Sequence, residues 1–127
     1  MGRAIGGVVV GYALWSVLWL GLNAGVQAAL PDIVDPLQPL THTGVLAFFV
    51  VASVVISIGS GFVCAAVRGS SSMKSVQVLA AALLVTGIGA EVSYWAMTPV
   101  WYHLVFLALL VPATLWGGSL RAGKAAA

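Results

Sequence analysis

The residue of this chain with the clearest potential for chemistry is Glu91, an acid within a long apolar stretch. It lies in the segment GIGAEVSYWAMTPVWYH, which runs from Gly87 to His103. A carboxyl group in such a stretch is energetically costly, and ionisable residues in these positions commonly mark proton or ion pathways. The imidazole that ends the segment can accept or donate a proton near neutral pH. Glu91 and His103 are therefore the first candidates for a functional site.

Three further polar residues complete the candidate site. Helical spacing places Asn23 and Gln27 on one face of the first apolar segment, and His42 stands at the start of the second one. Polar residues in membrane helices turn toward other helices rather than toward lipid. The predicted polar cluster, a candidate ion or proton site, therefore consists of Asn23, Gln27, His42, Glu91 and His103.

Three roles for Glu91 are open at this point. The carboxyl group can be protonated and hydrogen-bonded to Asn23 or Gln27, which is a structural role. It can be ionised against a protonated His103 or His42. It can also exchange protons with an outer aqueous cavity as part of transport. No Lys or Arg lies at its depth to neutralise it.

The two histidines raise a metal-binding alternative. Imidazoles from two helices can ligate a haem iron, and imidazole together with carboxylate suits zinc or copper. The metal candidates are His42, His103 and Glu91, but their spacing selects no ion and no basic residue on the outer side would pair with haem propionates. The single cysteine, Cys64, excludes a cysteine-based zinc site and an intramolecular disulfide. We therefore assign no resident cofactor.

Motifs for catalysis and for nucleic-acid binding are absent from the sequence. It contains no GxSxG, HExxH or P-loop pattern, so we expect no enzymatic activity. The formal net charge of +2 comes from five basic and three acidic residues, with no basic run of the kind that follows phosphates. We expect no nucleic-acid partner.

The composition indicates an integral membrane protein. Of the 127 residues, 61% are hydrophobic and 6% are charged, whereas about 25% are charged in an ordinary soluble domain. A soluble fold needs charged surface to stay dispersed, but a bilayer solvates apolar side chains directly. The partner that the composition predicts is therefore the lipid bilayer.

Four apolar segments predict an all-α fold, an up-down bundle of four transmembrane helices in one domain over residues 1–127. A span needs about 20 apolar residues, and the first segment is also too long for the apolar region of a signal peptide. Loops rich in proline, or in glycine and serine, separate the segments. The predicted helices are 4–30, 41–67 with Thr41 as its cap, 75–97 and 100–120.

Charges are segregated between the two sides of this arrangement. The acidic residues and the histidines all fall in the half opposite the termini. Because basic residues mark the cytoplasmic side, both termini are predicted to be cytoplasmic, and we expect the inner (plasma) membrane. The basic residues, which all fall on the side of the termini, are Arg3, Arg68, Lys74, Arg121 and Lys124.

The two halves of the chain resemble each other. The second and fourth segments align without a gap, which brings His42 to His103, and the first and third bring Asn23 to Glu91. A tandem repeat of a helical hairpin would leave this pattern, with the copies related by an axis along the membrane normal. A biased composition also produces such matches, so both interpretations stay open.

Small and aromatic residues have simpler interpretations. The GxxxG spacings Gly7–Gly11 and Gly21–Gly25 favour close helix contact, either inside the bundle or with a partner helix. Trp15 and Trp19, near mid-membrane, either pack or face lipid. A second group of small residues is expected to serve helix packing: Ser53, Ser57, Ser60 and Gly61. Aromatic residues beside the outer turn are expected at headgroup level: Tyr94, Trp95, Trp101 and Tyr102.

Three functions are consistent with these features. The first is a non-enzymatic accessory protein or small subunit that associates with itself or with a larger membrane complex. The second is a proton- or ion-coupled transporter or channel that works as an oligomer, with Glu91 as the coupling acid. The third is a metal- or haem-binding membrane protein that uses His42 and His103.

Overall fold

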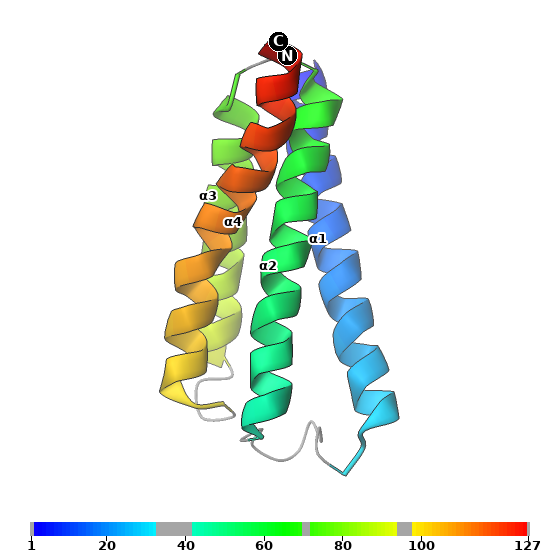
Figure 1. The fold of residues 1–127 in the computed structure, drawn as a ribbon, viewed down its shortest axis with the longest axis vertical. Helices are drawn as coiled ribbons and strands as arrows, with labels where there is room; N and C mark the ends of the chain where they lie inside the picture. The colour runs from blue at the N-terminus through cyan, green and yellow to red at the C-terminus, as the bar shows by residue number, and fades with distance from the viewer. Residues whose placement is uncertain (1, 33–41, 70–71, 94–97, 127) are drawn as a thin grey trace.

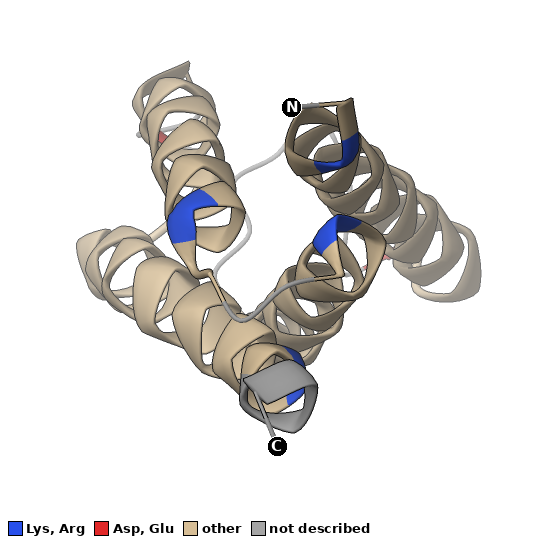
Figure 2. Ribbon diagram, turned by 90° about the horizontal axis from the view of Figure 1, so that it is seen from above, with Lys and Arg blue, Asp and Glu red and all other residues tan. Residues whose placement is uncertain are grey.

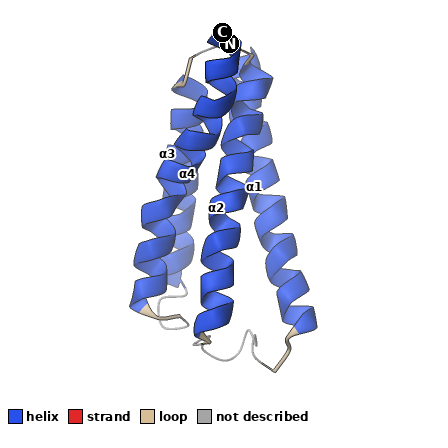
Figure 3. Cartoon of the chain, in the orientation of Figure 1, coloured by secondary structure: helices blue, strands red, loops and turns tan. Residues whose placement is uncertain are grey.

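A computed structural model describes residues 2–32, 42–69, 72–93 and 98–126, and within these residues it is all helical (Figures 1 and 3). The four helices are α1 (Gly2–Ala29), α2 (Thr43–Arg68), α3 (Lys74–Ser93) and α4 (Val100–Ala126). The predicted all-α, four-helix fold is confirmed.

Each helix is long and apolar enough to cross a membrane. The shortest, α3, has 20 residues, and a helix of that length extends about 30 Å, the thickness of the hydrocarbon layer. Successive helices run in opposite directions, so that both termini lie at one end of the bundle, which we call the terminal end (Figure 1). The opposite end is called the far end. These features are those of a multi-pass membrane protein.

The helix boundaries differ from the predicted ones mainly at the caps. The N-cap of α2 is His42, whose Nδ1 accepts a hydrogen bond from the backbone N–H of Val45 at 3.2 Å. The predicted cap, Thr41, lies outside the described residues, as do residues 94–97 of the third predicted helix. The helix α4 continues beyond 120 to Ala126, because the Ala, Arg and Lys residues of the tail favour helix.

Glycine residues set the closest helix contacts, and these lie toward the terminal end. A Cβ atom on Gly61 of α2 would overlap the carbonyl oxygen of Thr114, and one on Gly117 of α4 would overlap that of Ile58. A Cβ atom on Gly7 of α1 would lie 2.6 Å from the carbonyl oxygen of Cys64. Because glycine has no side chain, the backbones of α1 and of α4 each approach that of α2 closely here.

The other predicted small-residue contacts divide into two groups. Ser53, Ser57 and Ser60 are buried as expected. The second GxxxG pair, Gly21 and Gly25, lies on α1 where an added Cβ would meet nothing within 4 Å. Among the described residues, the first GxxxG pair therefore packs against neighbouring helices and the second does not.

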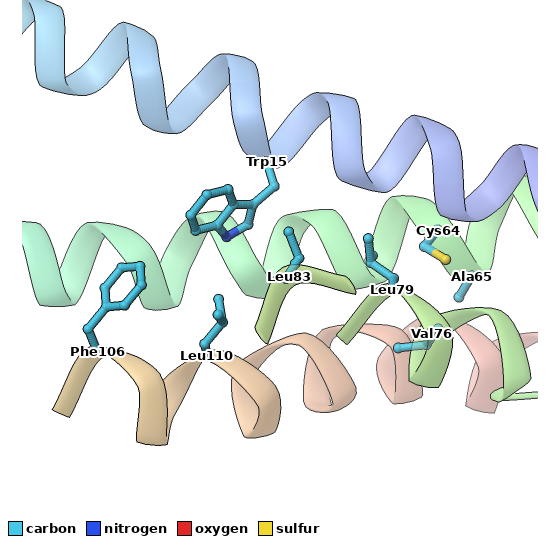
Figure 4. Packing of buried hydrophobic residues seen from close by; sticks show 8 residues of the cluster. All are labelled: Trp15, Cys64, Ala65, Val76, Leu79, Leu83, Phe106 and Leu110. Atoms are coloured by element: carbon cyan, nitrogen blue, oxygen red, sulfur yellow. The ribbon is translucent and has the colours of Figure 1, made fainter. Parts of the chain in front are cut away.

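Large side chains fill the space between the helices farther from the terminal end (Figure 4). In this view Trp15 extends from α1 toward Phe106 and Leu110 of α4, with Leu83 of α3 beside it. Trp15 and Trp19 stack with their ring centroids 5.5 Å apart. These two tryptophans therefore pack inside the bundle, which settles the alternative left open by the sequence.

Basic residues lie at the terminal end of all four helices (Figure 2). Arg3 of α1 donates from Nε to the carbonyl oxygen of Val67 at 3.0 Å, and Arg68 donates to Ser75 Oγ at 2.8 Å. Gly69 then ends α2 in a left-handed conformation with φ 74°, which glycine adopts without strain. Interhelical hydrogen bonds therefore join the ends of α1, α2 and α3 on this side.

Candidate functional site

The structure brings Glu91 and His103 into direct contact. Glu91 lies in the last turns of α3, and His103 lies in the first turn of α4. The chain reverses at Thr98 and Pro99, so these helix ends become neighbours. The His103 Nδ1 and the Glu91 Oε2 form a hydrogen bond, which becomes an ion pair when the imidazole is protonated. Glu91 is 8% exposed and His103 is fully buried.

Thr98 extends this pair to a third residue. Its Oγ1 lies 2.9 Å from the Nε2 of His103, so that both ring nitrogens have a partner. A protonated imidazole donates from Nδ1 to the Glu91 carboxylate and from Nε2 to the Thr98 hydroxyl group. If the Glu91 carboxyl group holds that proton instead, Nδ1 accepts the hydrogen bond and the Nε2–H still donates to Thr98. The two arrangements differ only in the position of one proton along the same bond.

Glu91 also lines a cavity of about 460 Å³ between α1, α3 and α4. This volume is within the range of small-molecule sites, about 300–1,000 Å³. The wall is mostly apolar and aromatic, with a few polar groups among the apolar ones. The lining residues are Trp15, Ser16, Trp19, Leu20, Asn23, Phe49, Thr86, Gly87, Ala90, Glu91, Thr98, Tyr102 and Phe106.

The Glu91 carboxyl group contacts His103 through one of its two oxygens, Oε2. Within the described parts of the chain, no donor is recorded for Oε1. An ionised carboxyl group can accept several hydrogen bonds through its two oxygens. The unused oxygen belongs to a side chain that lines the cavity, so a ligand there can reach it.

Two hydrogen bonds hold the helices together beside the cavity on its terminal side. The hydroxyl groups of Tyr12 and Thr86 are 2.7 Å apart and join α1 to α3. The indole Nε1 of Trp15 donates to Ser57 Oγ at 3.0 Å and joins α1 to α2. These bonds fix the position of α1 where the cavity begins.

The other three predicted site residues have different positions. Asn23 lines the same cavity as Glu91, but its Nδ2 donates to the carbonyl oxygen of Trp19 at 2.8 Å. Gln27 is exposed on α1. His42 caps α2, is exposed, and lines a second cavity of about 540 Å³ between α1 and α2. The structure thus joins Glu91 and His103, adds Asn23 to their cavity, and places Gln27 and His42 elsewhere.

The histidines already have hydrogen-bond partners that a metal would replace. His103 uses both ring nitrogens, and His42 uses Nδ1 for the helix cap. Among the residues whose placement is described, no three His, Cys, Asp or Glu side chains come together as a metal-ligand group. The two histidines also differ in burial, although the internal alignment pairs them. The duplication itself stays a prediction.

Sequence reasoning missed Thr98 and the aromatic wall. Tyr102 was expected at headgroup level but is only 6% exposed and stacks on Phe106, with centroids 6.1 Å apart. A spacing of four residues could have found the aromatic wall, because it puts Trp15 and Trp19 on one face of α1 and Tyr102 and Phe106 on one face of α4. No helical spacing applies to Thr98, which precedes α4. Trp101 is 41% exposed, and its position at headgroup level stays a prediction. Tyr94 and Trp95 lie outside the described residues.

In chemical terms, the site combines a proton-sharing pair with an aromatic cavity. The pair can take up or release a proton, and the cavity can admit an apolar molecule beside it. No protein-family model, curated protein or solved structure matches this chain. The geometry and the chemistry of these side chains therefore carry the functional argument.

Proposed function

We propose that this multi-pass membrane protein translocates protons, as a small proton-coupled transporter or channel in which Glu91 is the coupling acid. The observation that carries the proposal is the position of this carboxyl group. It is held by a buried imidazole through one oxygen, and its residue lines a cavity within the helical bundle. A purely structural acid needs a partner but needs no cavity.

The burial of the pair supports the same proposal. Ionisable groups within membrane-spanning segments are costly to retain, and they recur where protons cross membranes. The bond between Glu91 and His103 accommodates the proton on either residue. The proton can therefore move between them without leaving an unpaired charge in the bundle. We propose no catalytic step and no nucleic-acid partner for the chain.

For its orientation, we propose the inner (plasma) membrane with both termini in the cytoplasm. The argument is the basic terminal end, because Lys and Arg accumulate on the cytoplasmic side of membrane proteins. Glu91 and His103 then lie in the outer half of the bilayer. Labelling of a Ser72→Cys variant, after replacement of Cys64 by Ala, tests this orientation. Reaction with a membrane-impermeant thiol reagent from outside intact cells would contradict it.

Proton flux into liposomes tests the function. The purified protein is reconstituted with a pH-sensitive dye inside, and an inward pH gradient is imposed with potassium and valinomycin to balance charge. We expect faster acidification than in protein-free liposomes, and we expect Glu91→Gln to return the rate to that of the protein-free control, because an amide cannot exchange the proton.

Asp32→Asn is the matched control, since it makes the same chemical change at an exposed acid beyond α1. Its flux should equal that of the wild type. A wild-type rate no higher than that of empty liposomes would overturn the proposal, and so would a Glu91→Gln rate equal to the wild-type rate.

A second candidate function is the accessory or small-subunit role. The helix α1 buries only Gly7, Gly11 and Trp15, and a Cβ atom added to Gly21 or Gly25, which line the second cavity, would meet nothing within 4 Å. Small residues that the described helices do not pack against favour association with a further helix, in a second copy or in a larger complex. Cross-linking of the reconstituted protein tests this candidate. Exclusive recovery of monomers would remove self-association.

A further inference from the structure

The cavity beside Glu91 has a composition that selects one class of ligand. Its wall contains Trp15, Trp19, Tyr102 and Phe106, and the acid group is Glu91. Its described lining residues include no lysine or arginine to neutralise an anion. Sites for hydrated metal ions use several oxygen ligands, whereas this wall is mainly aromatic. The chemistry of the wall therefore favours an organic cation with an apolar body.

The aromatic side chains form a continuous cluster around this space. The ring centroid of Trp19 lies 5.3 Å from that of Phe106 and 5.7 Å from that of Phe49. Trp15 stacks on Trp19. Aromatic faces attract cations within about 6 Å of the ring centroid, and tryptophan does so best. Such a wall also removes apolar surface of the ligand from water.

We infer that the cavity between α1, α3 and α4 binds a monovalent lipophilic cation, with its charge beside the Glu91 carboxyl group and its apolar body against Trp15, Trp19 and Phe106. The inference names the substrate class of the site proposed above, and its transport aspect rests on that proposed function. The binding aspect stands on the cavity, the unused carboxyl oxygen and the aromatic wall.

Binding of the cation displaces a proton. The cation needs an ionised carboxyl group, and the Glu91–His103 pair holds one proton when the carboxyl group is neutral or the imidazole is charged. When the cation enters, this proton leaves for the solvent, and the neutral imidazole still donates one hydrogen bond to the carboxylate. Among the described wall residues, the titratable ones are Glu91 on α3 and Tyr102 on α4, while those of α1 and α2 add none.

The test uses tetraphenylphosphonium, a permanently charged probe whose own protonation state cannot change. Binding to the protein in phosphatidylcholine nanodiscs is measured by isothermal calorimetry, with empty nanodiscs subtracted, at several pH values. We expect saturable binding that weakens as the pH falls, and proton release on binding in weak buffer. Tetraphenylborate, which has the same shape and the opposite charge, should not bind above the empty-disc background.

Two variants define the role of the carboxyl group. Glu91→Gln should weaken binding about tenfold or more, since it removes the charge in a desolvated site. Asp32→Asn removes an exposed acid outside the cavity and should leave the dissociation constant unchanged. Both must run as single species in size-exclusion chromatography. The comparison of the two probes on the wild type needs no variant.

The outcomes separate this inference from the proposed function. Absence of saturable binding to the wild type overturns the inference and indicates that lipid alone fills the cavity. Equal binding of both probes, or unchanged binding by Glu91→Gln, overturns it as well. Proton flux that depends on Glu91 would still stand in those cases. Conversely, probe binding without proton flux would uphold the site and overturn the transport function.

Discussion

The half of the bundle near the terminal end and the half near Glu91 are held together by different kinds of residue. At the terminal end Gly7, Gly61 and Gly117 let backbones touch, and Arg3 and Arg68 bond across to neighbouring helices. In the other half large aromatic side chains separate the helices, and cavities of about 460 and 540 Å³ lie there, whereas the cavity between α1, α2 and α3 at the terminal end measures about 290 Å³. Contact between backbones fixes the separation of the helices, whereas large side chains hold the helices farther apart and leave room for a ligand. The proposed function belongs to the second half, where Glu91 lines its cavity.

The largest expected effect comes from Gly61→Ala, which removes the backbone contact between α2 and α4. The added Cβ would overlap the Thr114 carbonyl oxygen, so the helices must separate. We expect a loss of about 3 kcal/mol in the free energy of unfolding, measured by SDS titration in mixed micelles. Gly59→Ala, whose Cβ meets nothing within 4 Å, is the control on the same helix. Equal stability of the two variants would contradict the contrast between the halves.

An intermediate effect is expected in the other half from His103→Leu. It leaves the Glu91 carboxyl group buried without its partner, and we expect a loss of about 2 kcal/mol in the free energy of unfolding. The double variant Glu91→Leu with His103→Leu should recover most of this loss, because neither polar group remains. Recovery of stability together with loss of proton flux would show that the pair serves function rather than folding. A double variant less stable than His103→Leu would refute this.

The smallest changes in the free energy of unfolding are expected from the removal of two buried hydroxyl groups on α2. Ser57→Ala should cost about 1 kcal/mol, because the indole Nε1 of Trp15 loses its acceptor. Ser60 has no hydrogen-bond partner within the described residues, so Ser60→Ala should leave stability unchanged or raise it slightly. The same SDS titration resolves the order of the two. A larger loss for Ser60→Ala would reveal a partner for its hydroxyl group.

The number of helices could be predicted because a bilayer demands a minimum apolar length. Each of the four apolar segments meets it, and proline- or glycine-containing breaks separate them. The helix ends were harder to predict. The cap of α2 is an imidazole rather than a hydroxyl group, and α4 extends through a charged tail. Both details depend on small differences between neighbouring residues in their preference for a helix end or a helix interior.

The candidate site could be predicted only where chain connectivity determined it. Glu91 and His103 flank one turn, so that an antiparallel pair of helices brings them together. The positions of His42 and Gln27 relative to Glu91 depend on the rotation and tilt of α1 and α2, and these follow from side-chain packing. Glycine contacts at the terminal end and bulky side chains in the other half set that tilt. Spacing within one helix does not reveal it.

The hydrogen bond between Tyr12 and Thr86 has a mechanical consequence for α1. From Tyr12 to the end of this helix at Ala29 the arm is about 25 Å long, at 1.5 Å per residue. If α1 pivots about this bond, a tilt of about 5° moves its end at Ala29 by about 2 Å and barely moves the glycine residues near its start. A small tilt of this one helix would therefore change the width of the cavity beside Glu91.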